Sequence, residues 1–305
     1  MILAYLGPEG TFSLEAAKLA EPGADYRPLP TIEDVVDAVR DGQADLGVVP
    51  IENSTEGSVT MTLDALAFGP PGVFIRGEVA IAVSMNLLLK PGAPLEAVRE
   101  VRSHSQALAQ CRGFLRTKMA EVAVTATTST AEAARQVSES DGSLAALGTR
   151  KAAERFGLEI GLPDVHDFSG NATRFVVLAR RMAGPTGADK TSMVVFFGED
   201  RPGLLMRVLD EFALRGINLT KIESRPTKQQ LGEYCIFIDA AGHPTEPRME
   251  EALRSVHRHA AELRILGAYP RADQVTSEAL PSDTAEAYTD AAVWFGRLAQ
   301  DIDEV

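Results

Sequence analysis

The sequence predicts an α/β fold in two parts, an alternating α/β domain followed by a small βαββαβ domain. Short apolar runs alternate with helical periods over the first 180 residues, which is typical of an α/β domain. The segment Met182–Lys190 has the composition of a linker. The elements expected after it follow the order strand, helix, strand, strand, helix, strand, which is the ferredoxin-like pattern. A chain of 305 residues is long enough for both domains.

Each element of the first domain is predicted from its apolar pattern. Strands are expected at Ile2–Leu6, Asp25–Leu29, Leu46–Val49, Val73–Leu89 (with a break), Val98–Arg102, Val122–Ala126, Leu144–Leu147 and Phe175–Ala179. Helices are expected to begin near Phe12, Ile32, Ser58, Gln106, Thr130 and Arg150. Thr31, with Asp34 three residues later, is predicted to cap the second helix, and Val35, Val36 and Val39 give that helix its apolar face.

The second domain and the tail are predicted in the same way. The six elements after the linker are expected at Ser192–Phe197, Leu204–Leu214, Ile217–Ser224, Glu233–Asp239, Pro247–Ala260 and Leu263–Leu266. In the tail, one helical face is formed by Tyr288, Ala291, Ala292, Phe295, Leu298 and Ile302. Asp283 and Glu286 are candidates for the cap of this helix, which is expected to pack against the body of the protein or a second subunit.

Charge and composition exclude several functional classes. Thirty basic against 43 acidic side chains give a net charge of −13, which disfavours nucleic acid and anionic membranes as partners. The longest mostly apolar stretch, Val79–Leu89, is too short to span a bilayer. Cys111 and Cys235 lie far apart in the sequence, so neither a disulfide framework nor a cysteine metal site is expected. The first residues lack the basic region of a signal peptide, and a cytoplasmic protein is predicted.

Common catalytic signatures are mostly missing from the sequence. It contains no Gly-x-Gly-x-x-Gly, Walker loop, Gly-x-Ser-x-Gly or His-Glu-x-x-His pattern. His257 and His259 are two residues apart, so on a helix they point in different directions and form a poor metal pair. No metal and no cofactor is therefore expected.

Small polar residues gather where strands end and helices begin. These junctions are Gly7–Ser13, Pro50–Ser58, Ser103–Gln106, Thr127–Thr130 and Gly148–Thr149. In open α/β sheets ligands bind at such carboxyl ends, and free backbone N–H groups there favour anions. In Asn171-Ala-Thr-Arg-Phe175, an extended backbone would direct Thr173 and Phe175 to one side and Arg174 to the other. The alternative is a turn in which Asn171 and Thr173 satisfy local backbone groups.

These segments carry a resemblance to a known family. The runs Gly7-Pro-Glu-Gly-Thr-Phe-Ser13, Val49–Ser58, Ser103–Gln110, Thr130–Ala134 and Asn171–Phe175 resemble motifs of the prephenate dehydratases and occur in the family's order. The second domain, with Glu223-Ser-Arg-Pro226, is similar to the ACT regulatory domain attached to these enzymes. Two departures stand out. Ser105 replaces the proline of the family's Ser-His-Pro-Gln and is expected to be able to cap a helix, and Gly203-Leu204-Leu205 replaces the ACT Gly-Ala-Leu.

The resemblance implies a two-lobed catalytic domain like a periplasmic binding protein, followed by the ACT domain. Lobe one would comprise residues 1–80 and 165–181 and lobe two residues 81–164, followed by the linker 182–190, the ACT domain 191–271 and an acidic tail 272–305. The implied reaction is the decarboxylative dehydration of prephenate to phenylpyruvate in phenylalanine biosynthesis. It needs neither metal nor cofactor.

The resemblance also implies roles for individual residues. Thr173 matches the family's essential threonine, as donor or hydrogen-bonding partner of the departing hydroxyl, or as a proton relay. Arg174 would pair with a substrate carboxylate, the alternative being a structural role in its own loop, and Phe175 would contact the substrate ring or form the cleft wall. Neutral substrate-binding groups are expected at Asn171, Asn53, Ser54, Thr55, Thr11, Ser13, Gln106, Ser129 and Thr130. His104 is expected to support the site from outside the direct contacts.

Phenylalanine is the effector that the resemblance implies. Its site would be built from Gly203, Leu204, Leu205, Asn218, Leu219, Glu223 and Ser224 and shared between subunits of a homodimer or homotetramer. The larger side chain at Leu204 leaves the sign and strength of the effect open, and Glu223-Ser-Arg-Pro226 has the alternative of a plain strand end stopped by Pro226. Two further functions stay open: arogenate dehydratase activity, and a non-catalytic amino-acid-sensing binding protein.

Overall fold

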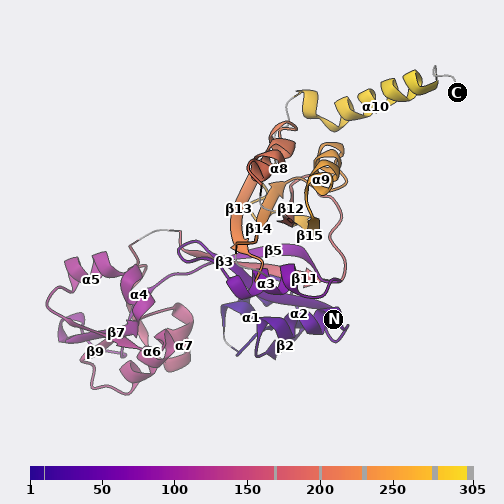
Figure 1. Ribbon diagram of the computed structural model, residues 1–305. Helices are drawn as coiled ribbons and strands as arrows, with labels where there is room; N and C mark the ends of the chain where they lie inside the picture. Colours follow the sequence, from indigo (N-terminus) through magenta and orange to yellow (C-terminus); the bar gives the residue numbers. More distant parts are fainter. Residues whose placement is uncertain (10, 168–169, 199–200, 229–231, 277–280, 301–305) are drawn as a thin grey trace. The chain divides into compact units, whose positions relative to one another are not determined.

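The computed structural model describes residues 1–9, 11–167, 170–198, 201–228, 232–276 and 281–300. It divides into two compact units, each with its own β-sheet (Figure 1). The first unit comprises Met1–Ile51, Ser58–Ala80 and Arg174–Val305; the second comprises Glu52–Gly57 and Ile81–Thr173. Within the described ranges, no helix has the length and apolarity needed to cross a bilayer.

The N-terminal part of the first unit is an α/β arrangement. Its elements are β1 (Ile2–Leu6), α1 (Phe12–Ala20), β2 (Asp25–Leu29), α2 (Ile32–Arg40), β3 (Leu46–Asn53), β4 (Gly57–Ser58), α3 (Thr60–Phe68), β5 (Phe74–Ala82) and β11 (Ala172–Ala179). The strand order is β5-β11-β3-β1-β2, and β1 is parallel to β2 and β3. The predicted cap is confirmed, since the Thr31 hydroxyl accepts the Asp34 N–H and the Asp34 carboxylate accepts the Thr31 N–H.

The predicted βαββαβ domain is confirmed. It consists of β12 (Asp189–Phe196), α8 (Leu204–Ala213), β13 (Leu219–Pro226), β14 (Tyr234–Ala241), α9 (Pro247–His259) and β15 (Glu262–Pro270). The strands form an antiparallel sheet in the order β13-β14-β12-β15. Helices α8 and α9 cover one face, where Phe212 and Met249 pack on Met193 and Val195 (Figure 1).

The two parts of the first unit share one continuous sheet. Gly267 of β15 pairs in parallel with Ile75 of β5. A Cβ atom at position 267 would lie 2.2 Å from the Ile75 carbonyl oxygen, so only glycine permits this approach.

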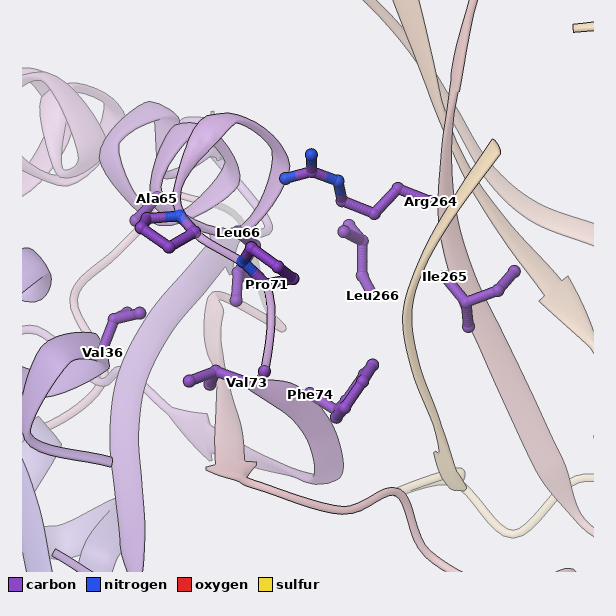
Figure 2. A pocket seen from close by; sticks show the side chains of 11 residues that line it. Val36, Ala65, Leu66, Pro71, Val73, Phe74, Arg264, Ile265 and Leu266 are labelled. Atoms are coloured by element: carbon purple, nitrogen blue, oxygen red, sulfur yellow. The ribbon is translucent and has the colours of Figure 1, made fainter. Parts of the chain in front are cut away.

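The second face of the ferredoxin-like sheet packs on α3. Val194 and Leu266 belong to the same apolar core as Leu66 of that helix. A cavity of about 40 Å³ remains along this seam between α3 and β15. Figure 2 shows the side chains that line it. At its rim, Arg264 Nη1 donates to the Gly69 carbonyl at 2.9 Å. The cavity is a small packing gap and contains none of the predicted site residues.

The second unit is a smaller α/β body. Its elements beyond the segment 52–57 are β6 (Asn86–Leu89), the 3₁₀ helix η1 (Leu95–Ala97), β7 (Glu100–His104), α4 (Ser105–Gln110), α5 (Arg112–Lys118), β8 (Ala123–Thr127), α6 (Thr130–Ser138), β9 (Leu144–Gly148), α7 (Arg150–Phe156) and β10 (Glu159–Leu162). The sheet order is β10-β6-β9-β7-β8. Its core joins Leu88 and Ala146 of the sheet with Ala134 and Val137 of α6.

Several boundaries differ from the predictions. The run Val73–Leu89 forms two strands, β5 and β6, which belong to different sheets. The helix expected near Ser58 begins at Thr60, because Gly57–Ser58 pairs with β3. Strand β12 begins inside the predicted linker, because Asp189 and the residues after it pair with β15. Strand β10 and helix α5 were not expected.

The tail helix α10 (Ala285–Gln300) forms as predicted, but its cap differs. The Ala287 N–H is accepted by the Thr284 hydroxyl, whereas Asp283 is buried in a preceding 3₁₀ turn, η2 (Pro281–Asp283). The start of α10 contacts α9, and Tyr288 is half-buried. Trp294 and Phe295 are 65% and 62% exposed, so packing of this later part of the helix on a second subunit stays a prediction. Ile302 of that face, like Gly10 of the first motif, lies outside the described residues.

Candidate functional site

The second unit brings together three predicted site residues from two distant segments. Asn53 Nδ2 donates to Asn171 Oδ1 at 3.1 Å and to Thr173 Oγ1 at 3.0 Å. Asn53 lies where β3 ends, and Thr173 lies at the start of β11. Neighbouring strands of one sheet therefore present these side chains to each other.

Backbone groups fix the orientation of the Asn53 amide. Its Oδ1 accepts the N–H of Thr55 at 2.9 Å and the N–H of Glu56 at 3.2 Å. A backbone N–H can only donate, so the oxygen must face this turn and the NH₂ group must face Asn171 and Thr173.

Ser54 ties the same two segments together through the backbone. Its N–H donates to the Ala172 carbonyl at 2.9 Å, and its hydroxyl accepts the Ala172 N–H at 3.0 Å. The hydroxyl also donates to the Gly170 carbonyl at 3.3 Å. These bonds clamp the segment 52–57 onto the start of β11, so the Asn53–Thr173 pair is held from both sides.

The Thr173 hydroxyl is left with its proton available. An amide N–H donates and cannot accept, so the Thr173 oxygen accepts from Asn53 and its own O–H is directed elsewhere. No described residue accepts that proton in a hydrogen bond. The arrangement therefore presents a polarised O–H donor, which suits an oxygen that gains negative charge during a reaction.

Arg174 points away from Thr173, as the extended pattern predicts. Its Nη1 donates to Glu78 Oε2 at 3.0 Å and its Nη2 to Asp239 Oδ2 at 3.2 Å. Lys190 Nζ also contacts Glu78 Oε2, at 3.1 Å. The guanidinium is thus bonded to two carboxylates of the chain itself, and its role toward a substrate carboxylate stays a prediction.

Charge balance explains how this network tolerates burial. Two cations face two carboxylates, and the Glu78 side chain is only 4% exposed. Burial by itself raises the pKa of Glu78, but Lys190, the Ala272 N–H and Arg174 together hold it below its ordinary value. Burial lowers the pKa of Arg174, but Asp239, Tyr269 and Glu78 together outweigh this effect, so the net shift of that pKa is upward. Both shifts favour the charged form, so Glu78 and Arg174 form an ion pair at neutral pH.

Sequence reasoning missed this network. Glu78, Lys190 and Asp239 belong to three strands that are distant from Arg174 in sequence, and no local motif marks them. The one available signal was the alternation along β11, which predicted that Arg174 faces the opposite side from Thr173.

Phe175, Thr11 and Ser13 lie in the first unit. Phe175 is 2% exposed, and its contact with the substrate ring or the cleft wall stays a prediction. Thr11 is the residue before α1, and its hydroxyl donates to the Leu6 carbonyl at 3.4 Å. Ser13 is buried in the first turn of α1.

The remaining predicted substrate residues of the second unit lie at two helix starts. His104 caps α4 by accepting the Gln106 N–H on Nδ1, so the cap is His104 and not Ser105. Ser129 caps α6 by accepting the Glu132 N–H at 3.0 Å, and Thr130 is the first residue of that helix. Among the described residues, no hydrogen bond joins these two helix starts to the Asn53–Thr173 pair.

The predicted effector residues lie at the start of α8 and along β13. Gly203 precedes α8 with φ of 87°, and a Cβ atom there would meet nothing within 4 Å, so the backbone conformation is what requires glycine. Leu204 and Leu205 open α8, while Asn218 and Leu219 lie where β13 begins. Glu223 accepts a hydrogen bond from Ser58, whereas Ser224 is exposed.

The described residues offer little for metal chemistry. Among them, no group of three or more His, Cys, Asp or Glu side chains is placed to hold a metal ion. What the site does present is neutral hydrogen-bond donors and one threonine hydroxyl.

Comparisons with known proteins agree with these features. The prephenate dehydratase family profile matches residues 3–183, and the ACT domain profile matches residues 192–258. The prephenate dehydratase of Amycolatopsis methanolica is 40% identical over 296 residues, which cover 96% of each protein.

Two solved structures are also similar. The prephenate dehydratase of Arthrobacter aurescens, solved in complex with L-Phe, has a TM-score of 0.86 and 38% identity, covering 98% of this chain and 100% of that chain. A protein described as a novel type of quorum quenching acylase has a TM-score of 0.74 and 32% identity, covering 88% of this chain and 98% of that chain. Because the family profile spans more than half of the sequence and the Amycolatopsis relative matches almost end to end, this chain belongs to the prephenate dehydratase family.

Proposed function

We propose that this chain converts prephenate to phenylpyruvate and that phenylalanine regulates the reaction through the ACT domain. The observation that carries the proposal is the hydrogen bond from Asn53 to Thr173, at the threonine that matches the family's essential residue. Family membership over most of the chain supports the same reaction.

The reaction requires a hydrogen-bond or proton donor more than it requires a base or a nucleophile. The C–C bond to the ring carboxylate breaks and releases carbon dioxide, and its electron pair completes the aromatic ring. The ring C–O bond breaks at the same time, and the departing hydroxide takes up a proton to leave as water. Hydroxide is a poor leaving group, so a hydrogen bond or proton at that oxygen lowers the barrier.

Thr173 supplies that hydrogen bond in the proposed mechanism. Asn53 donates to the Thr173 oxygen, which polarises its O–H bond toward the leaving hydroxyl. The proposed neutral groups around the substrate are Asn171, Ser54, Thr55, Thr11, Ser13, Gln106, Ser129 and Thr130. Neutral donors suit a substrate whose ring carboxylate must be free to leave, because a tight ion pair would stabilise the ground state.

The effector, assembly and location are part of the proposal. Phenylalanine would bind at Gly203–Leu205, Asn218–Leu219 and Glu223–Ser224, in line with the L-Phe complex of the Arthrobacter protein. A homodimer or homotetramer is proposed, which would cover the exposed side chains of Ile222 and Met206. A cytoplasmic location fits the two buried, unpaired cysteines.

The test is phenylpyruvate formation from prephenate by the purified chain near neutral pH. Thr173→Ala should lower kcat by about 10²–10⁴-fold, the usual contribution of a positioned proton donor. Asn53→Ala should cost about 10²-fold, since it leaves Thr173 without the group that orients it. The matched control is Thr117→Ala, because the hydroxyl of Thr117 bonds the Gly113 and Phe114 carbonyls within α5.

Other substrates separate this proposal from its alternatives. Turnover of arogenate but not prephenate would identify an arogenate dehydratase. Release of carboxylic acid from an N-acyl amide, without prephenate turnover, would match the chemistry of the related acylase. A folded chain that binds phenylalanine yet turns over neither prephenate nor arogenate would be a sensor, and the proposed reaction would be wrong.

A further inference from the structure

Strand β13 of the ACT domain has two chemically different faces. Lys221, Glu223 and Arg225 are half-buried, whereas Ile222 is 50% exposed and Ser224 is exposed. Alternate residues of a strand point to opposite sides of the sheet, so each set shares one face. The exposed face holds the proposed effector residue Ser224.

The half-buried face of β13 binds the catalytic domain. Glu223 Oε2 accepts the Ser58 hydroxyl proton at 2.5 Å, and Lys221 Nζ donates to the Ser58 oxygen. Lys221 Nζ also lies 3.3 Å from Glu223 Oε2. In this Lys221–Ser58–Glu223 contact the Ser58 hydroxyl accepts from the ammonium group of Lys221 and donates to the carboxylate of Glu223. Hydrogen bonds of a hydroxyl with such groups are strong.

A second contact on the same face is independent of Ser58. Arg225 Nη2 lies 3.0 Å from Asp64 Oδ1, and Lys228 Nζ lies 2.5 Å from Asp64 Oδ2. Asp64 belongs to α3, so its ion pairs join that helix to Arg225 of β13 and to Lys228, which follows β13.

Ser58 adjoins the segment that holds Asn53. The Val59 N–H donates to the Ile51 carbonyl at 2.8 Å, which fixes the two ends of the segment 52–57. Within that segment, the N–H groups of Thr55 and Glu56 orient Asn53. A short stretch of backbone therefore connects Ser58 with these two N–H groups.

We propose that Ser58 is a positioning residue that couples the ACT domain to the catalytic threonine. Occupation of the effector site shifts β13, the Lys221–Ser58–Glu223 contact carries the shift to the segment 52–57, and the Asn53–Thr173 hydrogen bond changes its geometry. Ser58 acts only through Asn53 and does not touch the substrate. The inference rests on the proposed function, since it names the route by which phenylalanine would regulate that site.

Ser58→Ala tests this route in the full-length chain. The measured quantity is the ratio of kcat/KM for prephenate without and with saturating phenylalanine, together with phenylalanine binding by calorimetry. Ser58→Ala should still bind phenylalanine, but the ratio should fall by about 5-fold or more, the lower end of ordinary allosteric coupling. Ser58→Thr keeps the hydroxyl and should restore the response.

Asp64→Asn is the matched control. It weakens the neighbouring ion pairs of the same face but leaves the contact at Ser58 intact, so it should keep the wild-type response. An equal loss of response in Asp64→Asn would mean that general loosening of the interface is responsible, and it would overturn the specific role of Ser58. An unchanged response in Ser58→Ala with phenylalanine bound would overturn it as well.

Amide hydrogen exchange gives a readout that needs neither phenylalanine nor turnover. Peptides covering residues 52–57 should exchange faster in Ser58→Ala than in the wild type, and those of Asp64→Asn should not. If wild-type protein neither binds nor responds to phenylalanine, the regulatory part of the proposed function fails. The exchange comparison still tests the connection between Ser58 and the segment 52–57, because equal exchange rates in Ser58→Ala and wild type would refute it.

Discussion

Replacing Glu78 by glutamine should destabilise the protein by about 3–5 kcal/mol, the usual cost of removing one partner from a buried ion pair. The Glu78 carboxylate lies 3.0 Å from Arg174 Nη1 and 3.1 Å from Lys190 Nζ, and it accepts the Ala272 N–H at 2.9 Å. Glutamine keeps the volume but removes the charge. Asp239 then remains as the one carboxylate of the network opposite two cations.

The magnitude follows from the burial of this carboxylate. Its side chain is 4% exposed, so solvent screens the interaction little and no reduction for exposure applies. No cavity term is added, since glutamine is isosteric. A loss of about 3 kcal/mol corresponds to a fall in Tm of about 6–12 °C for a protein of this size class.

The pH dependence gives the prediction a second check. The neighbouring cations and the Ala272 N–H hold the pKa of Glu78 below its ordinary value of 4.5, against the opposing effect of burial. A lowered folded-state pKa gives stability that is fully present above pH 4.5 and is lost as the pH falls through the folded-state pKa. The difference in Tm between wild type and Glu78→Gln should therefore be largest near neutral pH and shrink in acid.

Thermal melts followed by circular dichroism measure the effect. Glu250→Gln is the control, because Glu250 and Arg254 form an exposed pair on α9 with a nitrogen–oxygen distance of 2.6 Å. Such helical surface pairs contribute about 0.3–0.5 kcal/mol. A Glu78→Gln variant that melts with the control, or a difference that does not shrink in acid, would refute the reasoning.

Three other outcomes test separate parts of the fold. Thr31→Ala removes the cap of α2 and should lower the free energy of unfolding in urea by about 1 kcal/mol, whereas Thr31→Ser should retain the cap. Equal losses of stability in the two variants would contradict the capping argument. Gly267→Ala places a Cβ atom 2.2 Å from the Ile75 carbonyl oxygen and should lower the free energy of unfolding by about 1–3 kcal/mol. An unchanged unfolding midpoint would mean that β5 and β15 do not approach each other this closely. Burial raises the pKa of Cys111 to about 12 and that of Cys235 to about 11. Both thiols should therefore react slowly with a disulfide reagent at mildly alkaline pH until denaturant is added. Fast labelling of the native protein would argue against their burial.

Local sequence patterns predicted most elements, and the errors share one cause. The cap at Thr31 and the alternation of Thr173 and Arg174 are local properties, and both are confirmed. The break inside Val73–Leu89 was also visible, but not the fact that its halves belong to different sheets. Strand β12 extends into the Gly- and Pro-containing linker because β15 pairs with it from Asp189 onward. Pairing between strands that are distant in sequence cannot be predicted from a short window of residues.

The residues of the candidate site were predicted from the sequence, but their long-range contacts were not. The motif resemblance singled out Asn53, Asn171 and Thr173, and the structure joins all three by hydrogen bonds from one amide. It gave no reason to connect Ser58 with Glu223, 165 residues away, because that contact exists only once β13 lies against β4.

The sequence by itself determined where most strands and helices form and on which side of a strand a side chain projects. These properties follow from periodicity, because the pleat and the helical turn repeat over a few residues. Only the tertiary structure decided what each side chain meets: Arg174 finds Glu78 and Asp239, which lie 96 and 65 residues away. The physical reason is that neighbours in a sheet are chosen by burial of whole apolar faces, a property of the complete chain that no single segment encodes.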